Sequence, residues 1–200
     1  MAEIKKTIDE LCPPCLEDLN KTSSCGNARA GIKAIAFTLR RYVKKFPTKK
    51  PMESRSKFED HVFTTTGSLE MKSGKYFHKF EAKKNSAELK YILEGESGGK
   101  SYKASLEAYY SSFFGNIMGA MHVFKNADLV LLVKVGNNDW HLLGDEDEGV
   151  ELETNEAATG KNTTDPIGAN FMFSIAGLEG ATIYKGDTEK LFNEGSGSGS

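Results

Sequence analysis

The sequence predicts a mainly β (α+β) fold: an antiparallel β-sandwich or barrel with one packed α-helix and a long extended loop. Short segments rich in β-branched and aromatic residues recur along the 200 residues, and 20 glycines supply turns between them. Apolar residues take a helical period in the stretch 110–124. Short turns join most of the strand-like segments, and strands joined so closely pair antiparallel.

Strand-like segments alternate with turns through the first half of the chain. Ile35, Phe37 and Leu39 alternate at period two and predict the first strand. A long basic loop with two prolines follows, up to about residue 56. Gly67 and Gly74 mark turns further on. The strands expected in this half cover residues 32–43, 61–66, 69–83, 89–94 and 101–106.

The segment between the last two of these strands reads GESGGKS and invites comparison with a phosphate-binding loop. Such a loop needs a glycine five positions before Gly99, where this chain has Glu94, and it must lead into a helix. The residues after Lys100 alternate as a strand instead, and Glu94 and Glu96 would repel phosphate. The segment therefore predicts a hairpin turn.

One helix is expected in the middle of the chain. Ser111 and Ser112 suit its N-cap, and Gly115 and Gly119, one turn apart, would let it approach another backbone closely. Polar neighbours exclude a membrane-dimerisation helix, so we expect the helix to pack on the core. Its apolar stripe consists of Tyr110, Phe113, Phe114, Ile117, Met118, Met121 and Phe124.

The second half returns to strands. Leu129–Val135 is an apolar run of strand length and predicts a central strand covered on both faces. The turn 136–139 follows it. The further strands expected here cover residues 140–143, 149–154, 170–176 and 181–184.

The domain organisation follows from these elements. We expect an N-terminal extension at 1–30, one β-sandwich domain at 31–188 and a C-terminal tail at 189–200. Residues 3–11 can form a short helix, and the last six residues are a Gly-Ser repeat typical of an added linker. No apolar run reaches the length of a membrane span, and the charged N-terminus lacks the apolar stretch of a secretory signal, so we expect no membrane partner.

The net charge of -2 conceals an uneven distribution. Residues 1–57 carry 13 basic and 6 acidic groups, whereas residues 58–200 carry 13 basic and 22 acidic groups. Complementary charge of this kind favours head-to-tail association of identical chains. The residues that we expect at inter-subunit contacts are Arg40, Arg41, Lys44, Lys45, Lys49, Lys50, Asp145, Glu146, Asp147 and Glu148.

The basic stretch 40–57 leaves two other interpretations open. It could bind nucleic acid, since a cluster of lysine and arginine attracts phosphates. Tyr42 and Phe46 are its only aromatic residues, however, and two prolines hold it extended. It could also be a solvated surface loop.

No residue pattern predicts catalysis or a cofactor. Cys12 and Cys15 have CxxC spacing, but a zinc site needs four ligands, and a redox CxxC would follow a strand rather than the helical pattern seen before it. We expect these two thiols and Cys25 to be reduced. The acidic residues 145–148 lack the ligand spacing of a calcium loop. The four histidines stand singly, so we expect no metal site, no cofactor and no enzymatic activity.

The layout of the whole chain resembles major tail (tail tube) proteins of Bacteroidetes-type phages and prophages. The resemblance covers roughly residues 12–187 and is one of layout, without a diagnostic catalytic motif. The segments that carry it are Gly31–Ala36, Ala127–Val135, Trp140–Gly144, Gly149–Thr154, Thr159–Gly160, Asp165–Gly168 and Asn170–Ala176.

The resemblance implies a structural virion protein made in the cytoplasm of a bacterial host. Tail tube subunits are β-sandwiches with one helix, and they assemble into stacked, hexameric rings whose hairpins join across subunits into a continuous barrel. The resemblance implies that a long loop, here 44–57, reaches the neighbouring ring, that strands in 63–80 contribute hairpins to the lumen, and that other tail proteins are partners. DNA or cargo would pass through the lumen. A head-decoration, connector or baseplate subunit is the alternative within this class.

Overall fold

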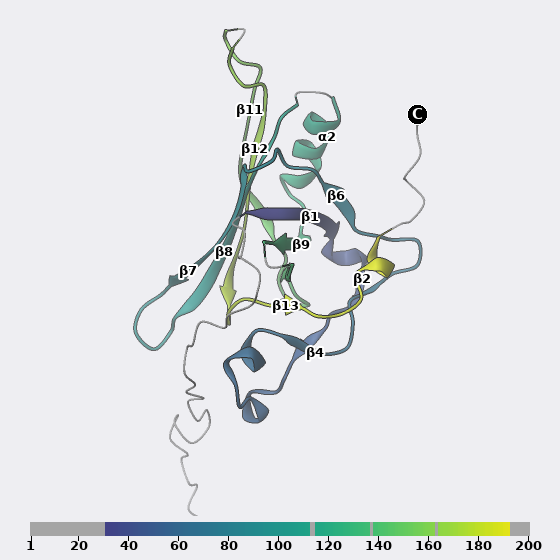
Figure 1. Cartoon of the computed structure of the whole chain (residues 1–200), viewed down its shortest axis with the longest axis vertical. Helices are drawn as coiled ribbons and strands as arrows, with labels where there is room; N and C mark the ends of the chain where they lie inside the picture. Colours follow the sequence, from purple (N-terminus) through teal and green to yellow (C-terminus); the bar gives the residue numbers. More distant parts are fainter. Residues whose placement is uncertain (1–30, 113–114, 137, 163, 193–200) are drawn as a thin grey trace, which may run out of the picture.

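The fold is known from a computed structural model that describes residues 31–112, 115–136, 138–162 and 164–192 (Figure 1). Its strands form one five-stranded sheet, one four-stranded sheet and two short ribbons. Every pair of named strands is antiparallel. The mainly β fold with antiparallel sheets and one helix, α2, is therefore confirmed for the described residues.

The five-stranded sheet forms the centre of the molecule, in the order β13-β10-β9-β1-β6. In its middle strand, Leu129 to Val133 are at most 1% exposed, and alternate side chains enter two separate apolar clusters. The prediction of a central strand covered on both faces is confirmed. The strands of this sheet are β1 (Ile32–Leu39), β6 (His78–Phe80), β9 (Leu129–Val135), β10 (Trp140–Leu143) and β13 (Ile183–Tyr184).

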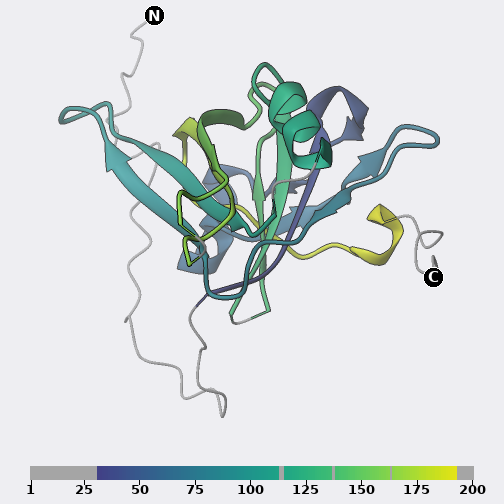
Figure 2. The ribbon, with the colours of Figure 1, turned by 90° about the horizontal axis from the view of Figure 1, so that it is seen from above.

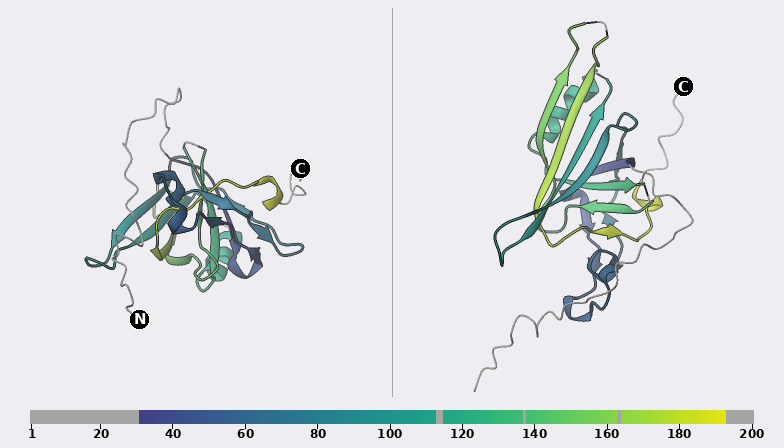
Figure 3. Two further views of the ribbon diagram at one scale, coloured as in Figure 1. Left: turned by 90° about the horizontal axis from the view of Figure 1, so that it is seen from below. Right: turned by 60° about the vertical axis from the view of Figure 1, so that its left-hand side comes forward.

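The four-stranded sheet packs against one face of the central sheet and extends beyond it (Figure 3, right). The order is β11-β12-β8-β7. The predicted hairpin is confirmed, since Glu94 pairs with Ser101 across the turn, and Figure 2 shows this hairpin projecting from the body. The strands are β7 (Ala87–Glu94), β8 (Ser101–Tyr110), β11 (Glu151–Ala158) and β12 (Gly168–Leu178).

The α-helix α2 (Gly115–Phe124) closes the core between the two sheets. Ile117 and Phe124 are buried, and the Phe124 ring lies 5.9 Å from that of Phe173 on β12. Tyr110, which we placed in the helical stripe, ends β8 instead. The close approach expected at Gly115 and Gly119 was wrong, because a Cβ atom at either glycine would meet nothing within 4 Å.

A second apolar cluster covers the opposite face of the central sheet. It contains Val43, Leu69, Phe77 and Tyr184, and the 3-10 helix η4 (Glu189–Leu191) adds Leu191. The described part of the segment that we assigned to the C-terminal tail therefore belongs to the core.

The predicted strand at 32–43 is divided. It ends at Leu39, because the next backbone amide, that of Arg40, donates to the carbonyl of Asp128 and the chain turns into η1. The strands expected at 61–66 and 69–83 are also shorter than predicted. The segments between β1 and β6 are η1 (Arg40–Tyr42), β2 (Val43–Lys45), β3 (Thr48–Lys49), η2 (Met52–Ser54), η3 (Phe58–His61), β4 (Thr64–Thr66) and β5 (Glu70–Met71).

The expected long basic loop folds into a lobe, which we define as residues 46–63. It lies at the lower end of the molecule in Figure 1, where β3 pairs with β4. The loop is therefore compact rather than extended. The helix expected at 3–11 and the three cysteines lie outside the described residues.

Candidate functional site

The basic stretch 40–57 begins at the end of β1, where η1 turns the chain. Arg40 is its first residue and makes two contacts from one guanidinium. Its Nε donates to Oδ2 of Asp128 at 2.5 Å, and its NH1 donates to the carbonyl oxygen of Glu146 at 2.6 Å. Arg40 thus joins the end of β1 to the acidic loop after β10.

That loop, residues 145–148, is a tight acidic turn. Oδ1 of Asp145 accepts hydrogen bonds from the amides of Asp147 at 2.9 Å and Glu148 at 2.8 Å, and the amide of Asp145 donates to the carbonyl of Glu148. Within the described residues, the carboxylates of Glu146, Asp147 and Glu148 form no ion pair. Among the residues predicted at contacts, Arg40 meets the acidic turn inside one chain, through the backbone carbonyl of Glu146 rather than through a carboxylate. Contact between the basic and acidic groups of different chains stays a prediction.

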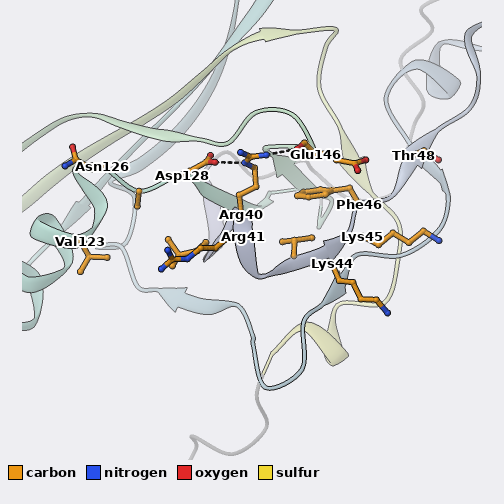
Figure 4. A pocket seen from close by; sticks show the side chains of 13 residues that line it. Arg40, Arg41, Lys44, Lys45, Phe46, Thr48, Val123, Asn126, Asp128 and Glu146 are labelled. Carbon is orange, nitrogen blue, oxygen red and sulfur yellow. Dashed lines mark hydrogen bonds and ion pairs between the residues drawn. The ribbon is translucent and has the colours of Figure 1, made fainter.

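A cleft of about 730 Å³ lies beside Arg40, between η1, β2, the end of α2 and the acidic turn (Figure 4). We call it the cationic cleft. Its apolar wall includes Val123, which is 57% exposed, and Phe46. Its charged lining contains four cations and two carboxylates, which are Arg40, Arg41, Lys44, Lys45, Asp128 and Glu146.

Four further cations of the basic stretch, Lys44, Lys49, Lys50 and Arg55, form ion pairs within the chain. The Arg55 side chain is 7% exposed and forms an ion pair with Glu179, and Lys49 lies 3.9 Å from the same carboxylate. Burial lowers the pKa of Lys49, although the Glu179 carboxylate partly opposes the shift. Lys44 forms an exposed pair with Glu70 at 3.6 Å. The two contacts with Glu179 hold the lobe against the end of β12.

Asp60 fixes the lobe internally. Its carboxylate accepts hydrogen bonds from the backbone amides of Ser56 at 2.9 Å and Lys57 at 3.2 Å, and from Nζ of Lys50 at 3.0 Å. These donors, led by the amide of Ser56, lower the pKa of Asp60 to about 2. Lys49 and Lys50 therefore have structural partners, whereas Arg41 and Lys45 have no carboxylate partner among the described residues.

The four-stranded sheet offers a second candidate surface at its two edges. Within the described residues, β7 is hydrogen-bonded to β8 only and β11 to β12 only, so each has one unpaired side. Both edge strands are eight residues long and mostly exposed. Such edges can pair with another chain.

The outward face of this sheet is acidic. Leu89, Leu106 and Phe171 point into the core, and the alternate positions point away from it. Glu153 joins the outward set because it forms an ion pair with Lys103 at 3.0 Å. The charged residues of this acidic face are six carboxylates and two lysines: Glu88, Glu94, Glu107, Glu151, Glu153, Glu156, Lys90 and Lys103.

Several of the residues that contact the basic stretch or join the two sheets were not predicted from the sequence. Asp128 and Glu179 stand alone, with no local pattern that marks them, and they meet the basic stretch only through the fold. The hydroxyl of Tyr91 on β7 lies 2.9 Å from Nδ1 of His141 on β10 and joins the two sheets. Spacing along the chain could not reveal these contacts.

Three comparisons with known proteins gave no relationship. No protein-family model, curated protein or solved structure matches this chain. Among the residues described, no helix is long and apolar enough to cross a membrane, and no group of three His, Cys, Asp or Glu side chains is arranged to hold a metal ion. GESGGKS forms the β7–β8 turn.

Proposed function

We propose that this protein is a structural virion subunit, a tail tube protein that self-assembles into stacked rings and forms a conduit for DNA or cargo. One observation carries the proposal: among the described residues, a four-stranded sheet has a long strand with one unpaired side at each edge, and its outward face is polar and acidic. The resemblance in chain layout supports the same class.

The strand directions suit closure of a ring. The four strands alternate in direction, so β7 and β11 run antiparallel to each other. When a copy is related to the next by rotation about a ring axis, its β7 meets the neighbour's β11 in antiparallel orientation, the more stable pairing. A closed ring would leave no edge of this four-stranded sheet unpaired.

The size of such a barrel suits a conduit. Six copies of a four-stranded sheet, the number that the resemblance implies, give a backbone barrel on the order of 50 Å across at ordinary strand spacing and tilt. Barrels of about 16–18 strands already enclose an aqueous channel. The acidic face would line the lumen and repel the DNA backbone, so that DNA would not adhere.

The lobe would make the contact between rings. It lies at one end of the molecule, and the β11–β12 hairpin extends at the other (Figure 1). Met52 on η2 and Ile167 before β12 are 45% and 52% exposed. Exposed apolar side chains at both ends would favour stacking along the long axis. The same surfaces would meet other tail proteins at the ends of a tube.

Electron microscopy of negatively stained protein tests assembly directly. We expect rings or tubes at high protein concentration. Monodisperse monomers across a range of concentration and salt would contradict the proposal. A ring that does not stack would favour the head-decoration, connector or baseplate alternative.

Disulfide trapping tests the proposed edges. Cys12, Cys15 and Cys25 are replaced by serine, and Lys90→Cys on β7 is combined with Thr154→Cys on β11. Oxidation should give a ladder of covalent oligomers that ends at the ring number, because each copy then carries both halves of a β7–β11 contact. Either single-cysteine variant should give dimers at most. A double variant that stops at dimers would contradict ring closure.

Nucleic-acid binding through residues 40–57 is a second candidate function, favoured by the exposed Arg41 and Lys45. It predicts DNA affinity that falls steeply with salt and is lost in Arg41→Ala/Lys45→Ala. Lys49 and Lys50 are poor probes because both have carboxylate partners in the lobe. No DNA binding at low salt would exclude this function.

A further inference from the structure

The cationic cleft carries positive charge that the described residues do not neutralise. Arg40 is held by Asp128, but Arg41 and Lys45 have no carboxylate partner there. The Lys44–Glu70 pair is exposed on both sides, 67% and 45%, and such pairs contribute little. A cleft of about 730 Å³ with this lining suits an acidic segment that also has apolar side chains.

The chain itself contains such a segment at residues 7–20, TIDELCPPCLEDLN. It has four carboxylates and no lysine or arginine, and its aliphatic residues could meet Val123 and Phe46. The carboxylates form two pairs, Asp9-Glu10 and Glu17-Asp18, on either side of the CxxC spacing.

The distance from Gly31 to the cleft favours docking by the segment of a neighbouring copy over docking by the segment of the same chain. The cleft lies at the end of β1 opposite to Gly31, about 26 Å away along eight strand residues. Residues 21–30 span at most about 36 Å when fully extended. Since β6 and β9 flank β1, and both faces of the sheet are covered, a segment of the same chain would have to pass round the sheet with little slack.

We infer that residues 7–20 of a neighbouring copy dock in the cationic cleft. The inference rests on the proposed self-association, and it gives the N-terminal extension a role as an arm that joins subunits. The arm complements edge pairing, because its attraction is electrostatic and weakens with salt.

Zero-length cross-linking of the assembled full chain tests this inference. Unlabelled and ¹⁵N-labelled chains are mixed, assembled in reductant and treated with a carbodiimide, which couples carboxylates to lysines. We expect peptides that join Lys44 or Lys45 to Asp9, Glu10, Glu17 or Asp18, including pairs of one labelled and one unlabelled peptide. Absence of these peptides, or pairs of matched label only, would overturn the inference.

Charge reversal supplies a second, independent test. Lys44→Glu/Lys45→Glu should raise the protein concentration at half-assembly by about tenfold. Adding Glu17→Lys/Asp18→Lys to the same chain should return the concentration at half-assembly to the wild-type value. Lys83→Glu/Lys84→Glu is the matched control, an exposed lysine pair outside the cleft. Failure of the rescue, or an equal effect of the control pair, would contradict docking of residues 7–20 in the cationic cleft.

The two proposals fail separately. If the β7–β11 cysteine ladder forms but the cross-links are absent, the proposed ring is supported and docking of residues 7–20 in the cleft is wrong. If no assembly is found under any condition, both proposals are wrong.

Discussion

Arg40 is the residue on which the candidate site depends most. It bonds to Asp128 before β9 and to the Glu146 carbonyl after β10, while its own backbone ends β1. We expect Arg40→Ala to lower the free energy of unfolding by about 1–2 kcal/mol, because two charge-assisted hydrogen bonds from a side chain that is 31% exposed are lost. Urea denaturation measures this change.

The neighbouring Arg41 is the control for that measurement. Its side chain is exposed and lies over the Tyr42 ring at 5.4 Å, so Arg41→Ala should change stability by no more than about 0.5 kcal/mol. Equal losses in the two variants would show that the Arg40 contacts with Asp128 and Glu146 contribute nothing to stability.

His141 gives the fold a pH dependence. Burial lowers its pKa, although Asp139 partly opposes the shift. The unfolded chain therefore binds more protons than the folded chain below about pH 6.5. The stability that neutral His141 contributes is present above that pH and is lost as pH falls through the folded-state pKa.

Thermal unfolding between about pH 7 and pH 5 checks this expectation. The melting temperature of the wild type should fall over that interval, and His141→Gln should flatten the curve. Asp60 and Glu179, whose pKa values are lowered, act in the same direction but in a more acidic range, below about pH 4.5. Identical curves for the two proteins would contradict a role for His141.

At the scale of elements, the four-stranded sheet depends on a close approach at Gly168. A Cβ atom there would lie 2.3 Å from the carbonyl oxygen of Tyr110, a backbone atom that cannot swing aside. We expect Gly168→Ala to destabilise the protein by about 1–3 kcal/mol through overpacking. Gly180→Ala is the control, since a Cβ atom there meets nothing within 4 Å. Chemical denaturation compares the two, and equal stability would contradict the close approach.

Elements with strong local signals could be predicted from the sequence. The β7–β8 hairpin has a glycine-rich turn, β9 is an apolar run of strand length, and α2 has a helical period. The strand at 32–43 could not be placed as well, because its end depends on a hydrogen bond between Arg40 and Asp128, 88 residues away. The lobe was predicted as a loop up to about residue 56, because β3 is only two residues long and shows no period.

The site could be predicted only in part, for a related reason. The charges of the basic stretch were visible as a group, but their division into paired and unpaired members depends on Glu179, Asp60 and Asp128. Arg41 and Lys45 emerge as unpaired once these partners are placed. The acidic face likewise requires the register of four strands.

At the scale of the whole molecule, the net charge is near zero, but acidic and basic side chains gather on two different surfaces. The outward face of the four-stranded sheet is acidic, and the cleft lined by the Arg40–Asp128 pair is cationic. In the proposed ring, the first surface would line the lumen and the second would receive the neighbour's arm. The segregation thus suits a conduit that binds its own copies and repels what passes through.

The acidic face therefore predicts how much DNA assembled tubes retain. Wild-type tubes should retain little duplex DNA at physiological salt, because carboxylates in a narrow lumen repel phosphates. Glu94→Lys/Glu151→Lys/Glu156→Lys turns three outward carboxylates into cations, and these tubes should retain DNA in co-sedimentation, with retention that falls as salt rises. Glu189→Lys, an exposed position on η4 outside both the sheet and the lobe, is the control and should behave as the wild type. Because retention by the triple variant requires the altered face to be accessible to DNA, a triple variant that assembles but binds no more DNA than the control would contradict an acidic lumen.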